Sequence, residues 1–316
     1  MDARSHTSSL VQRAEISGDR RLSLAQRLLW LGFNVANNWT AAPRGGALPA
    51  FDFVLDAERQ AALAAKCHDK SSPSRRLSDM FWMSLPWAEI ARALGGRLDV
   101  AEIGCGSGYL GRLIAGYAPE TDYTGCDLFA HPDWEKRTSE RFRFRVADAR
   151  NVADILRGRN LIVTQSALEH FEEDLTFFRQ AAAEAEAHGA PLLQIHLMPS
   201  PACLWLYLWH GYRQYSHRRL EEIAALFGAR AFAAAVALGA GRCNAVHARY
   251  ITRPMLTGRP DRREAGTAAY VAELTAAIAA DMARPDFARA SFYALIVGSN
   301  LGGEIALPAL VPSRSR

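Results

Sequence analysis

The chain has 316 residues, of which 49% are hydrophobic and 22% charged, a composition typical of a soluble globular protein. Its formal net charge of +4 is too small to indicate a nucleic-acid partner. The five cysteines show no Cys-x-x-Cys spacing, which argues against a disulfide framework and against a structural zinc site. No stretch has the ~18 consecutive apolar residues of a membrane span. Without a signal-peptide pattern, the chain is expected to be a reduced cytoplasmic protein.

Residues 1–95 are expected to form a helical extension, because they contain several short amphipathic patterns. Residues 1–20 are polar and are expected to be disordered. Leucine and valine at helical spacing predict a helix over 22–35. Asp56 is the expected N-cap of a second helix, over 56–66.

A strand, a glycine-rich turn and a helix follow one another from residue 98 onward. A short apolar run ends in Glu102, and glycines then alternate at positions 104, 106 and 108 before an apolar stripe at helical spacing. Glycine permits positive φ and lets a ligand approach main-chain N–H groups that no side chain shields. The pattern therefore predicts a nucleotide-type binding loop.

Two kinds of nucleotide fit this loop. Residues 106–111 match Gly-x-Gly-x-x-Gly, which suits the pyrophosphate of NAD or FAD at a helix N-terminus. Against that interpretation, Glu102 is hard to place in a dinucleotide fold, where a strand buried on both faces prefers apolar residues. The next predicted strand ends in Asp127, about where an acid meets a ribose diol in either case.

Strands and helices continue to alternate beyond the loop, which predicts a doubly wound α/β fold with helices on both faces of a mostly parallel sheet. A third strand runs into Asp148, and a fourth runs into Leu168-Glu169-His170. Further strands are expected over 191–197, 230–238 and 292–298.

The longer pattern Glu-x-Gly-x-Gly-x-Gly over 102–108 resembles the first motif of class I S-adenosylmethionine (SAM) methyltransferases. Residues 160–171, with their Leu-Glu-His ending, resemble the fourth motif of the same family. The resemblance implies a Rossmann-like, seven-stranded, mostly parallel sheet in the order 3-2-1-4-5-7-6, with an antiparallel last strand. It also implies SAM as the cofactor.

Carried onto this chain, the resemblance assigns a role to each acid. The loop would wrap the methionine and ribose part of SAM with Glu102 near the sulfonium, Asp127 would meet the ribose, and Asp148 would accept from the adenine amino group. A helix opened by Pro86 would cover the pocket, with Arg75, Arg76 and Asp79 as further candidates to face SAM. The expected cofactor-binding residues are Glu102, Gly104, Cys105, Gly106, Gly108, Tyr109, Asp127, Leu128, Asp148, Ala149, Gln165 and Ser166.

Methyl transfer to an alcohol needs a base as the new bond forms. His170 is the first candidate, because the fourth motif ends beside the methyl group in this family, and His196 at the end of the fifth strand is the second. Related ubiquinone-type and small-RNA methyltransferases bind a metal through Glu-x-x-Glu-His. Ser166 replaces the first acid here, so no metal site is expected.

The expected SAM-binding domain spans 96–302, and 303–316 are expected to be a C-terminal tail. Two segments exceed the minimal fold: 198–217, rich in tryptophan and tyrosine, and an insert over 239–288 before the last strand. The first follows the fifth strand at its carboxyl end and is expected to wall the acceptor site.

The sequence thus favours SAM-dependent methyl transfer to a hydroxyl of a small molecule or glycan. A small-molecule nitrogen acceptor stays open, whereas the motifs of enzymes acting on base amino groups or on cytosine C5 are missing. Two alternatives remain: a NAD-linked oxidoreductase, and a methyltransferase-like protein that binds SAM without turnover.

Overall fold

The computed structural model describes residues 16–39, 48–228, 231–301, 305, 307 and 309–313. Most of the stretch expected to be disordered, 1–20, therefore lies outside the described residues. Its described part, 16–20, is an ordered turn in which Ile16 and Ser17 are buried.

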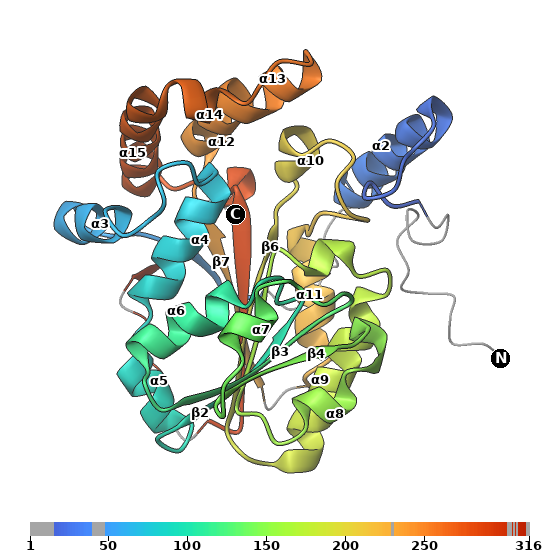
Figure 1. Ribbon diagram of the computed structural model, residues 1–316, viewed down its shortest axis with the longest axis vertical. Coiled ribbons are helices and arrows are strands. Elements are labelled where there is room, and N and C mark those ends of the chain that lie inside the picture. Colours follow the sequence, from blue (N-terminus) through green and yellow to red (C-terminus); the bar gives the residue numbers. More distant parts are fainter. Residues whose placement is uncertain are drawn as a thin grey trace.

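One sheet runs through the molecule, with strands in the order β4-β3-β2-β5-β6-β8-β7-β1-β9 (Figure 1). β8 is antiparallel to both β6 and β7, whereas β2 to β6 pair in parallel. The strands are β1 (Ala50–Phe53), β2 (Leu98–Ile103), β3 (Thr121–Asp127), β4 (Phe142–Val146), β5 (Leu161–Gln165), β6 (Leu192–Pro199), β7 (Ala231–Leu238), β8 (Phe292–Ser299) and β9 (Leu310–Pro312).

Leaving out β1 and β9, the order of the other seven strands is the expected 3-2-1-4-5-7-6, so that prediction is confirmed. The expected strand count of seven is wrong, because the described residues form nine strands. β1 adds to β7 in parallel, with Phe51 opposite Val236, and β9 then adds antiparallel to β1. The two additions give the β7 edge a hydrogen-bonding partner that it would otherwise lack.

Helices cover both faces of the sheet (Figure 1). The sheet therefore separates two layers of the hydrophobic core. Alternation along β2 sends Leu98 and Val100 into one layer and Ala101 and Ile103 into the other. The first layer includes α4 (Pro73–Ser84), α5 (Trp87–Ala93) and α6 (Tyr109–Tyr117), and the second includes α8 (Ala153–Leu156), α9 (Asp174–His188) and α11 (His217–Ala225).

The N-terminal helices follow the expected start signals, with one correction. Asp56 caps α3 (Ala57–Ala64) by accepting from the Arg59 amide, as predicted. The expected helix over 22–35 is α2 (Leu24–Trp39). Ahead of the helix that follows Pro86, however, Pro73 opens a separate 12-residue helix, α4, whose N-cap is Ser72.

The insert over 239–288 forms a small helical layer beyond the end of the sheet (Figure 1). Its start is fixed by the buried Asp281, which accepts from the amides of Ala240, Arg242 and Cys243.

Among the described residues, no helix is both long enough and apolar enough to cross a membrane. The remaining elements are α7 (Trp134–Arg137), η1 (Ala149–Asn151), η2 (Leu168–His170), α10 (Cys203–Leu206), α12 (Gly241–His247), η3 (Ala248–Thr252), α13 (Arg253–Leu256), α14 (Arg262–Ala265), α15 (Thr267–Ala283) and η4 (Phe287–Arg289).

Candidate functional site

A cavity of about 900 Å³ opens where β2, β3 and β5 end. In a doubly wound sheet this edge is the ordinary ligand site, because the carboxyl ends of parallel strands and the helix N-termini meet there. Its walls include the predicted residues Glu102, Gly104, Cys105, Gly106, Tyr109, Asp127, Leu128, Asp148, Ala149, Gln165 and Ser166.

The glycine loop between β2 and α6 adopts the left-handed conformation that its sequence requires. Gly104, Gly106 and Gly108 have φ of +76°, +50° and +76°. A Cβ on Gly104 would collide with Ala167, and one on Gly108 with the ring of Phe144, whereas one on Gly106 meets no protein atom within 4 Å. Gly108 therefore serves packing and does not line the cavity, unlike Gly106.

Side chains from β3 and α7 hold this loop in place. Asp127 accepts from the amides of Gly106 at 2.8 Å and of Leu128 at 2.7 Å. The indole of Trp134 donates to the Gly106 carbonyl at 2.8 Å, and the guanidinium of Arg137 donates to the Ser107 carbonyl. Contacts from β3 and α7 thus hold the loop on both sides of Gly106.

Glu102 is a buried acid at the end of β2. Tyr123 donates its hydroxyl hydrogen to Glu102 Oε2 at 2.5 Å. Burial raises the pKa of Glu102 to about 8, outweighing the opposite effects of the Tyr123 and Gly111 hydrogen bonds. Burial likewise raises the pKa of Tyr123 well above its usual value. Glu102 therefore lines the cavity as an acid that keeps its proton to a higher pH than an exposed glutamate does.

A third acid of the cavity wall lies at the end of β4. Asp148, after β4, caps η1 through the Arg150 amide and pairs with the Arg150 guanidinium at 2.7 Å. That hydrogen bond outweighs burial and lowers the pKa of Asp148. Leu128 and Phe129 are exposed apolar side chains in the same wall, with 52% and 76% of their surface accessible. Exposed apolar groups in a cavity wall suit a planar, apolar ligand face.

Gln165 is the last residue of β5 and Ser166 follows it, and both line the cavity. The indole of Trp82 donates to Gln165 Oε1 at 3.0 Å, and Gln165 Nε2 has no hydrogen-bond partner among the described residues. Ser166 has a φ of +50°, an uncommon backbone for a residue other than glycine. Strain of this kind clusters at ligand sites.

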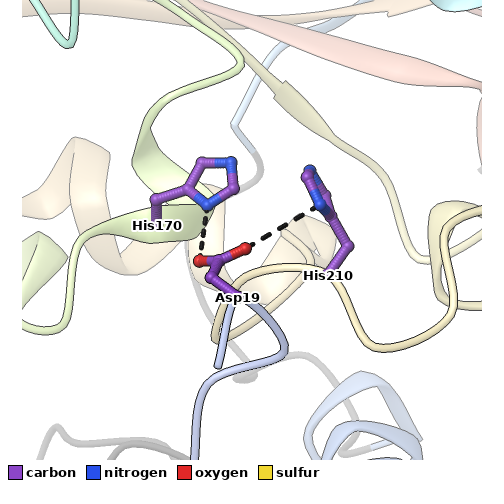
Figure 2. Close-up of side chains that lie close together, drawn as sticks. All are labelled: Asp19, His170 and His210. Atoms are coloured by element: carbon purple, nitrogen blue, oxygen red, sulfur yellow. Dashed lines mark hydrogen bonds and ion pairs between the residues drawn. The ribbon is translucent and has the colours of Figure 1, made fainter. Parts of the chain in front are cut away.

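His170 lies in the cavity wall and is paired with Asp19 (Figure 2). Its Nδ1 is 2.7 Å from Asp19 Oδ2, and because a carboxylate only accepts, Nδ1 carries the hydrogen. Burial alone would lower the pKa of His170, but Asp19 and Glu169 raise it. Burial alone would raise the pKa of Asp19, but the hydrogen bond and charge of His170 lower it to about 2.

The turn over 16–20 brings Asp19 to this position. The Gly18 amide donates to the Gly211 carbonyl at 2.8 Å, and the Gly211 amide donates to Asp19 Oδ1 at 3.1 Å. The indole of Trp30, on α2, donates to the same Gly211 carbonyl at 2.9 Å. The N-terminal segment is therefore built into the site, a contribution that the sequence analysis missed.

Asp19, His170 and His210 together have the donor atoms of a metal site. One ligand atom from each lies within 4.8 Å of the others, and His210 Nδ1 is 3.9 Å from Asp19 Oδ1 (Figure 2). Two imidazoles and a carboxylate are a set that divalent transition metals accept. In the structure, two of these ligand atoms, Asp19 Oδ2 and His170 Nδ1, are joined to each other by a hydrogen bond.

The expectation that His196 is a second candidate base is wrong. His196 is fully buried in β6, with Phe177 and Phe178 packed edge-on against its ring. Burial lowers the pKa of His196 to about 3, and its ring nitrogens contact Thr164 and Gln194. The side chain faces the core layer under α9, so it has no access to an acceptor.

The three charged residues of α4 lie in different surroundings: one lines the cavity and two are buried. Arg75, one of the three candidates from the sequence, lines the cavity, with its guanidinium 5.7 Å from the centre of the Tyr109 ring. Arg76 and Asp79 are buried in the α4 packing and do not line it. Burial raises the pKa of Asp79 to about 6.

The aromatic residues of 198–217 also lie in different surroundings, and only some of them line the cavity. Tyr212 lines the cavity. Trp205 is exposed, and Trp209 packs under Arg27 of α2, with 4.8 Å between the guanidinium carbon and the ring centre. These two tryptophans, expected to wall the acceptor site, are not part of the cavity wall.

No protein-family model matches the chain, and no curated protein matches it. Solved structures do match, and several are SAM-dependent methyltransferases, the class whose motifs the chain resembles. At identities of 12–15%, the likeness of this chain to such structures is one of fold.

One such structure is a SAM-dependent methyltransferase from Archaeoglobus fulgidus, 15% identical, covering 67% of this chain and 92% of that one with a TM-score of 0.41. The plantazolicin methyltransferase BamL, in complex with a triazolic desmethylPZN analog and SAH, is 12% identical over 77% of this chain and 97% of that one, with a TM-score of 0.43. The [4+2]-cyclase SpnF is 12% identical over 94% and 98%, with a TM-score of 0.45.

Proposed function

We propose that the chain binds SAM in the cavity of about 900 Å³ and transfers its methyl group to a hydroxyl of a small molecule or glycan. One observation carries the proposal: acids at three successive strand ends, Glu102, Asp127 and Asp148, surround one cavity with the glycine loop. A paired histidine, His170, lies in the same wall.

The residues of the cavity fit SAM in chemical character. Gly106 offers an open main-chain surface, Asp127 has carboxylate lone pairs for a ribose diol, and Leu128 supplies an apolar face for adenine. Arg75 suits the carboxylate of the methionine part. The volume of about 900 Å³ accommodates a cofactor of this size together with part of an acceptor.

The chemistry required of the protein is modest. When bound, SAM supplies an activated methyl group on a sulfonium. The cavity walls would hold the acceptor oxygen in line with that carbon, so that a C–O bond would form as the C–S bond broke and its electron pair stayed on sulfur. With its Nδ1 hydrogen directed to Asp19, the neutral ring of His170 has a lone pair on Nε2 to take the hydroxyl proton.

Binding experiments separate this function from a NAD-linked oxidoreductase. In calorimetric titrations of the purified chain, SAM and SAH are expected to bind and NAD is not. Binding of NAD alone would overturn the proposal. Transfer of radiolabelled methyl from SAM to a panel of hydroxyl compounds, with amines for comparison, then separates an enzyme from a protein that binds SAM without turnover.

We also propose a reducing, cytoplasmic location for the protein. All five cysteines are buried free thiols, which is the usual state of cysteine in that compartment. Localisation of a tagged chain in fractionated cells tests this, and recovery from an oxidising compartment would contradict it.

A further inference from the structure

A second, smaller cavity of about 180 Å³ adjoins the larger one. Arg75 and Ser166 line both cavities, so the two share a boundary at the end of β5. His210 lines the smaller cavity, and its ring centre lies 4.7 Å from that of His170, which lines the larger one. A ligand group in the smaller cavity would therefore lie next to the proposed base.

Two buried polar atoms in the wall of the smaller cavity are unsatisfied. Glu169 Oε2 and Arg213 Nε have no hydrogen-bond partner among the residues that the structure describes, and their side chains are nearly inaccessible, at 2% and 3% exposure. The other nitrogens of Arg213 are used, since they donate to the carbonyls of Phe171 and Glu172. Leaving such atoms unpaired is costly, so a ligand that pairs with both gains affinity.

The charges around the cavity select against ionic ligands. An anion would face the carboxyl group of Glu169, whereas a cation would face Arg75 and Arg213. A neutral group that both donates and accepts meets neither penalty.

The rest of the wall suits a ring with hydroxyl groups. Tyr207 and Phe292 present aromatic carbon, against which the C–H faces of a sugar pack. Ser72 and Ser74 add hydroxyl groups, and Ser74 and Tyr207 share a hydrogen bond of 2.8 Å. At about 30 Å³ per water, a volume of about 180 Å³ equals that of about six water molecules, which limits the occupant to one small ring.

We propose that the smaller cavity is an acceptor subsite that binds a single neutral, hydroxyl-rich ring, such as a sugar or cyclic polyol, between Glu169 and Arg213. This inference rests on the proposed function, because it places the ring so that one of its hydroxyls reaches His170 and the methyl group. It narrows the acceptor class from any hydroxyl compound to a compact polyol.

Ligand-observed NMR on the full chain, saturated with SAH, tests the subsite. The neutral probe is methyl β-D-glucopyranoside, and the charged probes are inorganic phosphate and choline. The neutral probe is expected to bind, and the charged probes are not. Binding of phosphate or choline in its place, or no binding of the glucoside, overturns the inference.

Variants show where the probe binds. Glu169→Gln is expected to weaken glucoside binding about tenfold, because a carboxyl acceptor is lost. The matched control Glu186→Gln changes an exposed glutamate of α9 and should leave it unchanged. Ser74→Leu places a larger side chain of α4 in the cavity and should abolish glucoside binding. This variant tests the subsite even if Glu169→Gln does not fold. Equal glucoside affinity in wild type and Ser74→Leu overturns the inference.

SAH affinity, measured on the same samples, separates the two proposals. Wild type that binds SAH but no glucoside refutes the subsite alone. Wild type that does not bind SAH refutes the proposed function, whatever the glucoside does.

Discussion

His170 Nδ1 and Asp19 Oδ2 are 2.7 Å apart, although 151 positions separate the two residues in the chain. The carboxylate fixes the imidazole with its Nδ1 hydrogen inward, and it raises the pKa of the ring. An oriented, more basic imidazole is the arrangement that proton abstraction from an alcohol requires.

Asp19→Asn is expected to shift the acid limb of the pH–rate profile to lower pH. The reacting form of His170 is neutral, so the rate rises as pH passes upward through its pKa. Because Asp19 raises that pKa, removing its charge lowers the pKa and makes the neutral form available at lower pH. The profile is measured with any acceptor found by radiolabelled methyl transfer. A limb that stays in place or moves to higher pH contradicts the assignment.

His170→Ala is expected to reduce turnover by about 10²–10⁴-fold, the usual loss for a general base. SAH affinity should hardly change, because the three acids proposed to hold the cofactor lie at the ends of β2, β3 and β4, whereas His170 follows β5. Steady-state kinetics and calorimetry on the same variant check both. If the variant retains at least a third of wild-type turnover, His170 only braces the loop and is not the base.

Gly106→Val is expected to abolish SAM binding with the fold retained. A side chain at this position meets no protein atom within 4 Å and points into open space, where only a ligand would be in the way. Gly158→Val is a matched control, because Gly158 also has positive φ, +70°, and open surroundings but does not line the cavity. Equal losses of SAM affinity in the two variants would mean that backbone strain, and not contact with SAM, explains the effect.

Asp127→Ala is expected to weaken SAM binding by roughly 1–3 kcal/mol, since it removes an acceptor from the cavity and frees the Gly106 amide. Asp122→Ala, on the same strand β3, is the control: Asp122 pairs with Arg97 away from this cavity. Titration calorimetry of the two variants measures the difference. Unchanged SAM affinity in Asp127→Ala would leave the ribose role unsupported.

Dialysis against a chelator is expected to leave turnover unchanged, because the hydrogen bond to Asp19 uses His170 Nδ1. The cluster with His210 makes this a direct test. Lost activity that Zn²⁺ or Mn²⁺ restores would identify Asp19, His170 and His210 as ligands, and His170 would then no longer be free to act as the base.

The glycine loop and the strand-end acids could be predicted because each signal is local. Glu102 follows a short apolar run directly, and Asp127 ends the next one. His196 shows the limit of such counting: β6 continues to Pro199, so His196 lies inside the strand and not at its end. Its side chain is directed to the core, beside Phe177 and Phe178.

Other parts of the site could not be predicted, because they depend on contacts between distant segments. Asp19 belongs to a polar stretch without periodicity, and its role exists only because Gly211 holds the turn over 16–20. β1 and β9, with four and three residues, are too short to show an alternating pattern. Pro73 and Ser72 did carry a helix-start signal for α4.

The pairing of β1 has a consequence for how the chain folds. Ala50 pairs with Ala235 of β7, and the outer side of β1 pairs with β9, from Phe51 opposite Pro312 to Phe53 opposite Leu310. During synthesis, the N-terminal strand therefore waits unpaired until most of the chain has left the ribosome. Contacts of such long sequence separation slow folding, and an open edge strand is a template for aggregation. Nascent chains that stop before β9 should therefore depend most on chaperones.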